Sequence, residues 1–145
     1  MSTDRLQRFI DAQNEQLTEI EGELRSGRKR SHWIWYVFPQ VAGLGTSSTT
    51  KHYAIADLEE ARAYLAHPVL SGRLRRHTGL VIACSAPITT ILGHPDDLKF
   101  RSSMTLFDRV SPNDVFAEAL QKHFNGEPDA STLRLLAAGR EIGGD

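Results

Sequence analysis

Residues 31–45 read SHWIWYVFPQVAGLG, and this is the one stretch of the chain in which strand and helix compete. Its aromatic and β-branched residues favour a strand by propensity, yet every other segment long enough to pair with such a strand has a helical pattern. Ser31 can cap a helix, and Pro39 can end one. The stretch therefore predicts one or two buried helical turns over 31–38, followed by an irregular glycine-containing loop over about 40–51.

The segments on both sides of this stretch have the apolar spacing of helices. Mainly apolar stripes with steps of three or four residues lie on one face of each helix: Leu6, Ile10, Gln13, Leu17, Ile20 and Leu24 in the first, and Leu70, Leu74, His77, Val81 and Cys84 in the second. Gly27 is typical of a helix end, and Pro68 of a helix start. Capping and stop signals indicate further helices within 57–66, 85–93, 95–110, 111–126 and 129–136.

The predicted fold class is therefore all-α: a single compact bundle of about six to seven helices, with an irregular Gly-containing loop after the aromatic segment. The chain has 145 residues, the size of one ordinary domain, and neither a repeat nor a linker divides it. We expect one helical domain over 1–145, with its core over about 4–138 and a flexible tail over 139–145. The predicted core contains Leu6, Ile10, Leu17, Trp33, Val37, Leu70, Leu74, Val81, Phe107 and Leu120.

Charge and cysteine content exclude several classes of protein. Lys and Arg number 17 against 18 Asp and Glu, so the chain lacks the overall positive charge typical of nucleic-acid-binding proteins. The single Cys84 cannot form an internal disulfide bond. The N-terminus lacks a signal-peptide pattern, and no apolar run is long enough to cross a membrane. These features predict a cytoplasmic protein without a membrane partner.

Metal and cofactor motifs are absent from the sequence. The six histidines are scattered and form no His-x-x-x-His pair, so no metal site is expected. The loop GLGTSSTTK lacks the glycine that precedes the lysine of a phosphate-binding loop, and no cofactor is expected. His77 lies on an apolar stripe, which is typical of a hydrogen-bonded core histidine. Cys84 continues the same stripe and is expected to be buried and inert.

Three segments each join a cation to aromatic or hydroxyl groups: 28–36, 51–53 and 99–103. Such groups can hold a phosphate while stacking a base or a sugar. We predict that Trp33 and Val37 turn into the core and that the neighbouring side chains face a cleft. The ligand-binding residues expected there are Trp35, Tyr36, Lys51, Arg101 and Ser102. His32 is the candidate for proton transfer, because histidine changes its charge near neutral pH.

The predicted function is binding of a small anionic ligand, nucleotide-like or sugar-phosphate-like, in a cleft beside residues 31–38, with or without hydrolysis. Each segment also has an ordinary structural interpretation, since Arg and Lys near helix ends often satisfy terminal carbonyl groups and Trp is often core. The alternative function is a non-catalytic adaptor whose exposed aromatic residues contact a protein. The sequence leaves open whether the protein is an enzyme and whether it forms homo-oligomers.

Three long motifs carry a family resemblance: RKRSHWIWYVFPQVAGLG at 28–45, a run with EEARAYLAHPVL at 53–70, and DDLKFRSSMTLFDRV at 96–110. Together they resemble the bacterial domain-of-unknown-function 1810 family, over roughly residues 6–136. The resemblance implies a compact, mainly helical domain and no particular reaction. The genomic label "calpastatin" used for this family would require a disordered inhibitor, which the regular apolar stripes contradict. A fainter likeness to small helical domains that process ADP-ribose matches no motif residue by residue.

Overall fold

The structure is a computed structural model that describes the backbone of residues 2–143 and the side chains of residues 5–139. Within these residues the chain forms nine α-helices and no strand, which confirms the all-α prediction. There are more helices than predicted because several are short. The helices are α1 (Ser2–Ser26), α2 (Ile34–Val37), α3 (Ser48–His52), α4 (Leu58–Ala66), α5 (Pro68–Ala83), α6 (Ile88–Leu92), α7 (Asp96–Val110), α8 (Val115–Phe124) and α9 (Ala130–Gly143).

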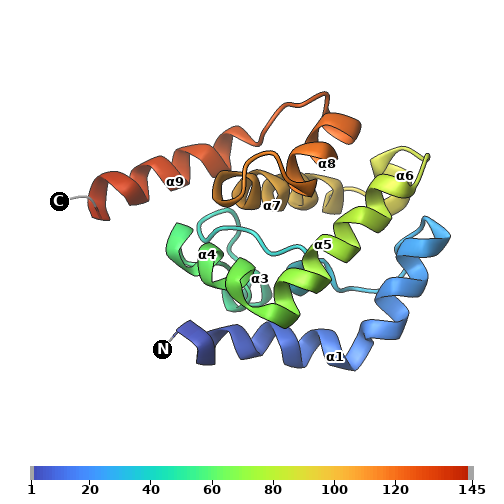
Figure 1. Cartoon of the computed structure of the whole chain (residues 1–145), viewed down its shortest axis with the longest axis horizontal. Coiled ribbons are helices and arrows are strands. Elements are labelled where there is room, and N and C mark those ends of the chain that lie inside the picture. The colour runs from blue at the N-terminus through green and yellow to red at the C-terminus, as the bar shows by residue number, and fades with distance from the viewer. Residues whose placement is uncertain (1, 144–145) are drawn as a thin grey trace.

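Helix α5 crosses the middle of the molecule (Figure 1). It packs against α1 on one side and against α8 on the other, while α7 contacts α4, α8 and α9. In Figure 1, α1 lies along one edge, α7 and α8 lie towards the opposite edge, and α9 leads to the C-terminus. The short helix α2 lies between these layers, in contact with both α1 and α7.

Several helices begin or end at the residues that the capping signals indicated, but the predicted cap at Ser31 is wrong: α2 begins after Trp33 without a side-chain cap, and the Ser31 hydroxyl binds Glu23 instead. The side chain of Asp57 accepts a 2.9 Å hydrogen bond from the backbone N–H of Glu60 at the start of α4. Pro68 is the first residue of α5, and Asp129 caps α9 through the N–H of Thr132 at 2.9 Å. Gly27 ends α1 with a φ of 79°, a conformation that glycine adopts without strain.

The core confirms most of the predicted buried residues and corrects two. Ile10 and Leu17 are both only partly buried. Phe9 is fully buried instead, with its ring 5.2 Å from the ring of Tyr64 and 5.9 Å from that of Tyr53. The buried stripe of α1 is therefore turned towards Phe9, because the aromatic ring fills space between two tyrosines that only the folded chain brings together. The other eight predicted core residues are buried.

The aromatic segment is fixed by one carboxylate of α1. Glu23 accepts hydrogen bonds from the indole N–H of Trp33 at 2.9 Å and from the backbone N–H groups of Arg30 and Ser31 at 2.7 and 2.9 Å. It also accepts a 2.6 Å bond from the Ser31 hydroxyl. Partial burial alone would raise the pKa of Glu23, but these hydrogen bonds outweigh it and lower the pKa to about 2. Glu23 thus anchors the basic run to α1 as an ionised group.

Helical turns over 31–38 are confirmed, although α2 has only four residues. The predicted loop over 40–51 is partly wrong, because α3 occupies its second half. The hydroxyl of Ser47 caps α3 by accepting a 3.1 Å hydrogen bond from the N–H of Thr50. The polar, hydroxyl-rich sequence hid this helix, since it has no apolar stripe.

Helix α9 continues beyond the predicted end at Leu136 as far as Gly143. The predicted flexible tail lies partly outside the described residues, because the backbone of 144–145 and the side chains of 140–145 are not described. In the described part of the chain, no helix has the length and apolar character needed to cross a membrane.

Candidate functional site

Two lysines from distant parts of the chain bind the same carboxylate beside the aromatic segment. The ammonium group of Lys29 lies 2.8 Å from Asp96 Oδ2, and that of Lys99 lies 3.5 Å from Asp96 Oδ1. Lys29 lies over the ring of Trp33 at 5.2 Å, and Lys99 over the ring of Trp35 at 5.1 Å. Each tryptophan therefore has a cation on its face. One carboxylate is thus shared by two ammonium groups.

Lys99 is the more available of the two lysines. Its side chain is 27% exposed, whereas that of Lys29 is 7% exposed, and its contact with Asp96 is the longer one. Lys99 also lines a pocket between the N-terminal half of α7, the loop before α3 and the start of α9. We call this the α7 pocket. It measures about 230 Å³ and is lined by Gln40, Leu44, Gly45, Thr50, Pro95, Leu98, Lys99, Ser102, Asp129 and Ser131.

The α7 pocket also contains an acceptor that is only half used. Asp129 Oδ2 accepts hydrogen bonds from the hydroxyl of Ser102 at 3.3 Å and from the N–H and hydroxyl of Thr132 at 2.9 and 2.6 Å. All the hydrogen bonds that described residues donate to this carboxylate go to Oδ2. The second oxygen, Oδ1, accepts no hydrogen bond from a described residue, so one acceptor of this carboxylate is unused.

The α7 pocket thus places an ammonium donor and a carboxylate acceptor in one small cavity. Gln40, Thr50 and Ser131 add side chains that can both donate and accept hydrogen bonds. Its apolar lining includes Leu98, which is 48% exposed. Drug-sized ligands occupy cavities of about 300–1,000 Å³, so a ligand here must be smaller. No group of three or more His, Cys, Asp and Glu among the described residues could hold a metal ion.

Three of the residues proposed from sequence lie in or near the α7 pocket. Ser102 is buried in its wall and bonds to Asp129. Trp35 lies beneath Lys99, and its indole N–H is buried without a hydrogen-bond partner among the described residues. Lys51 is exposed on α3 and directly follows Thr50, which lines the pocket.

The other three residues lie elsewhere. Arg101 turns to the loop before α9, where it donates a 3.0 Å hydrogen bond to the carbonyl of Glu127 and pairs with the carboxylate of the same residue. The hydroxyl of Tyr36 donates to the side chain of Gln16 on α1. His32 is exposed at the start of the segment. The structure therefore does not bring all six proposed residues into one cleft.

The ring of Tyr36 lines a separate cavity of about 330 Å³ that also contains Asp11 and Glu15. Burial raises the pKa of the Tyr36 hydroxyl, and the negative charge of Glu15 raises it further. Arg8 also lines this cavity, but its guanidinium group already binds the carbonyls of His52 and Ala54 and pairs with Glu60, so the described residues of this cavity offer no free cation to an anion.

Sequence reasoning missed Lys99 and Asp129 as pocket residues. Lys99 and Ser102 are three residues apart and share one face of α7, whereas Arg101 lies on another face. This spacing is visible in the sequence, and it favours Lys99 over Arg101 as the residue that shares a site with Ser102. For Asp129 the sequence predicts only a helix cap, because nothing in the sequence shows that α9 begins beside α7.

The fold and the α7 pocket define a small all-α protein with a polar cavity between helices. The chain belongs to the family described as "Protein of unknown function (DUF1810)", whose model matches residues 3–136. The solved structure of the conserved hypothetical protein Rv1873 from Mycobacterium tuberculosis is 48% identical to this chain, with a TM-score of 0.89. The match covers 91% of this chain and 96% of that one. No curated protein matches the chain. The family resemblance read from the motifs is thereby confirmed.

Proposed function

We propose that this protein binds a small hydroxylated ligand with one anionic group, of the sugar-phosphate class, in the α7 pocket. The observation that carries the proposal is that Lys99 and Asp129 line the same cavity of about 230 Å³. Lys99 binds the anionic group, and Asp129 Oδ1 accepts a hydrogen bond from a ligand hydroxyl. A ligand with both kinds of group satisfies both side chains at once.

The electrostatics around Asp96 support an anionic ligand. If Lys99 turns from Asp96 to the ligand, Asp96 keeps the shorter ion pair with Lys29. The rearrangement therefore leaves no partly buried carboxylate without a partner, which keeps its cost low. Trp35 supports Lys99 from below through its ring face.

Of the two classes of ligand expected from the sequence, the sugar-phosphate class fits the α7 pocket better. The volume of about 230 Å³ suits a phosphorylated monosaccharide and is small for a base, sugar and phosphate together. We leave hydrolysis out of the proposal, because His32 is exposed and is not among the residues that line this pocket.

The adaptor alternative has less support. An adaptor of this kind needs a contiguous apolar patch of several hundred Å² on its surface. Among the large hydrophobic side chains that the structure describes, two are exposed: Val69 at the start of α5 and Leu98 on α7. These two side chains belong to different helices, and one of them already lines the pocket.

The proposal is tested by thermal unfolding with ribose 5-phosphate, glucose 6-phosphate and glycerol 3-phosphate. A ligand at about one hundred times its dissociation constant stabilises the folded state by about 2.7 kcal/mol, which raises the midpoint by several degrees. We expect such a rise with at least one of the three. Each variant is compared with its own midpoint in buffer, so changes in intrinsic stability cancel.

Lys99→Met and Lys51→Met are a matched pair, because each removes one positive charge from a partly or fully exposed side chain. We expect Lys99→Met to lose most of the ligand-induced rise and Lys51→Met to keep at least half of it. The proposal fails if none of the three sugar phosphates stabilises the wild-type protein. It also fails if Lys99→Met responds as strongly as wild type.

A further inference from the structure

A further cavity, of about 600 Å³, lies where the C-terminal ends of α1 and α5 meet the segment that leads into α6. We call it the α1–α5 pocket. Its inner wall is apolar and includes Leu24, Leu80, Ala83 and Ala86. This volume lies within the range of cavities that bind small organic molecules. It shares no lining residue with the α7 pocket.

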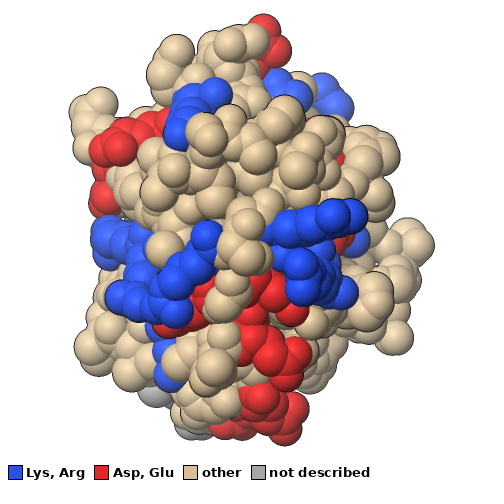
Figure 2. Space-filling view, turned by 90° about the vertical axis from the view of Figure 1, so that its right-hand side faces the viewer, with Lys and Arg blue, Asp and Glu red and all other residues tan. Residues whose placement is uncertain are grey.

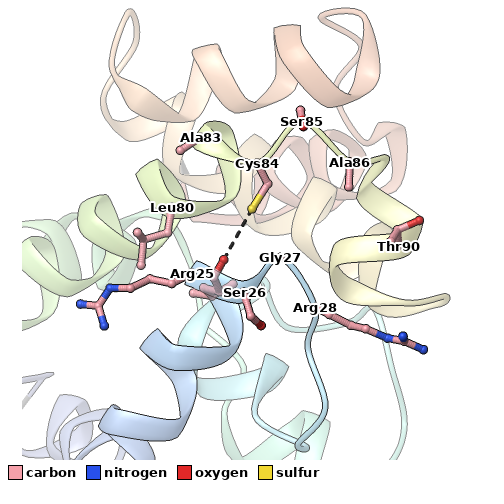
Figure 3. A pocket seen from close by; sticks show the side chains of 11 residues that line it. Arg25, Ser26, Gly27, Arg28, Leu80, Ala83, Cys84, Ser85, Ala86 and Thr90 are labelled. Atoms are coloured by element: carbon pink, nitrogen blue, oxygen red, sulfur yellow. Dashed lines mark hydrogen bonds between the residues drawn. The ribbon is translucent and has the colours of Figure 1, made fainter.

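The rim of the α1–α5 pocket is cationic. Arg25 and Arg28 line it, and Figure 3 shows their side chains extending to opposite sides with Cys84 between them. The face of the molecule at which α1 ends carries a band of Lys and Arg side chains, with acidic side chains directly below the band (Figure 2). An apolar wall with a cationic rim suits a molecule that has an apolar body and an anionic group.

Neither arginine is held by a strong ion pair among the described residues. Arg28 is exposed and forms no ion pair with a side chain that the structure describes. Arg25 is 55% exposed and pairs with Glu21 at a long 3.4 Å. The other oxygen of Glu21 is bound by Arg76 and His77, each at 3.1 Å, so Glu21 keeps two partners if Arg25 turns away. Both guanidinium groups are therefore free to bind an anion.

We propose that the α1–α5 pocket binds an amphipathic organic anion, with its apolar body against the wall formed by α1 and α5 and its anionic group on Arg25 or Arg28. The ligand class is an aromatic or acyl carboxylate, sulfonate or phosphate. This site is separate from the one proposed for sugar phosphates. Either can exist without the other.

Cys84 makes occupancy of this pocket measurable. It is the single cysteine of the chain, and it is partly exposed rather than buried as predicted. Its thiol donates a weak 3.5 Å hydrogen bond to the carbonyl of Leu24 and lines the pocket (Figure 3). Alkylation of this thiol by iodoacetamide therefore reports on access to the cavity alone.

The probe is 1-anilinonaphthalene-8-sulfonate, whose fluorescence rises in an apolar site, and the neutral control is N-phenyl-1-naphthylamine, which has the same rings without the sulfonate. We expect saturable binding of the sulfonate at neutral pH, at least fivefold tighter than that of the neutral compound. Saturating sulfonate should slow alkylation of Cys84 at least fivefold. Equal affinity for the two compounds, or unchanged alkylation at saturation, would overturn the proposal.

Arg28→Gln and Arg30→Gln provide matched variants, since both residues are exposed and belong to the same basic run, but only Arg28 lines the cavity. We expect Arg28→Gln to weaken sulfonate binding about tenfold, as for loss of one charge-assisted hydrogen bond, and Arg30→Gln to change it less than twofold. If Arg25 alone holds the anion, Arg25→Gln shows the tenfold loss instead. The proposal is wrong if neither Arg25→Gln nor Arg28→Gln weakens binding more than Arg30→Gln does.

Discussion

Lys29, in the basic run before the aromatic segment, forms a 2.8 Å ion pair with Asp96, the first residue of α7. The lysine side chain is 7% exposed and also lies over the ring of Trp33. This pair explains why cations adjoin the tryptophans: one of them ties the segment to α7. The neighbouring arginines, Arg28 and Arg30, remain exposed.

Lys29→Met should destabilise the protein by about 3 kcal/mol, because it leaves the partly buried Asp96 with only the longer contact to Lys99. Urea unfolding measures this change. Lys51→Met, on the exposed face of α3, should change the free energy of unfolding by less than about 0.5 kcal/mol. Equal effects of the two substitutions would show that the ion pair contributes little.

The two tryptophans should respond differently to replacement by phenylalanine. Trp33→Phe removes the 2.9 Å hydrogen bond to Glu23 and should cost about 1–3 kcal/mol. Trp35→Phe removes an indole N–H that has no partner among the described residues and should cost less. Thermal unfolding of both variants tests the order, and a larger loss for Trp35→Phe would contradict the assigned roles.

Glu23 should contribute to acid unfolding. Its pKa is about 2 in the folded protein and about 4.5 in the unfolded chain, so the unfolded state takes up the proton first as the pH falls. The stabilisation by ionised Glu23 is fully present above about pH 4.5 and is lost as the pH falls towards 2. Glu23→Gln should therefore weaken the pH dependence of the unfolding free energy in this window. An unchanged slope in the variant would mean that Glu23 titrates normally in the folded protein.

Alanine substitutions at Phe9 and Ile10 test whether Phe9 is the core residue of α1 at this position. Phe9→Ala should cost about 3–5 kcal/mol, because it empties a fully buried site between Tyr53 and Tyr64. Ile10→Ala should cost clearly less, since Ile10 is only partly buried. Chemical unfolding of the two variants measures the difference. A larger loss for Ile10→Ala would support the sequence prediction that Ile10, and not Phe9, is the core residue.

These residues also show how far sequence reasoning reaches. Caps such as Asp57 and Asp129 act on N–H groups within three residues, so local sequence indicates where their helices begin. The choice between Phe9 and Ile10 depends on partners more than forty residues away, which periodicity cannot supply. His77 was predictable as a core histidine because its stripe is local, and it is fully buried with a 3.1 Å contact to Glu21.

The α7 pocket was beyond sequence reasoning for the same reason. Its polar residues come from positions as far apart as Gln40, Lys99 and Asp129: α7 packs against α9, and the loop before α3 adds Gln40. Each has an ordinary local interpretation as a loop, surface or capping residue. Only Lys99 and Ser102, which share a helix face, carried a readable signal.

The most direct test of the proposed function is an NMR titration of ¹⁵N-labelled protein with each of the three sugar phosphates, with the parent sugar or glycerol and inorganic phosphate as separate controls. The account predicts saturable shifts of the backbone amide signals of Gln40, Thr50 and Ser131, with clearly weaker binding of either control, because Lys99 and Asp129 each need their own group on the ligand. An absence of shifts at these three amides with all three sugar phosphates, or binding of phosphate alone as tight as that of the best sugar phosphate, would contradict it.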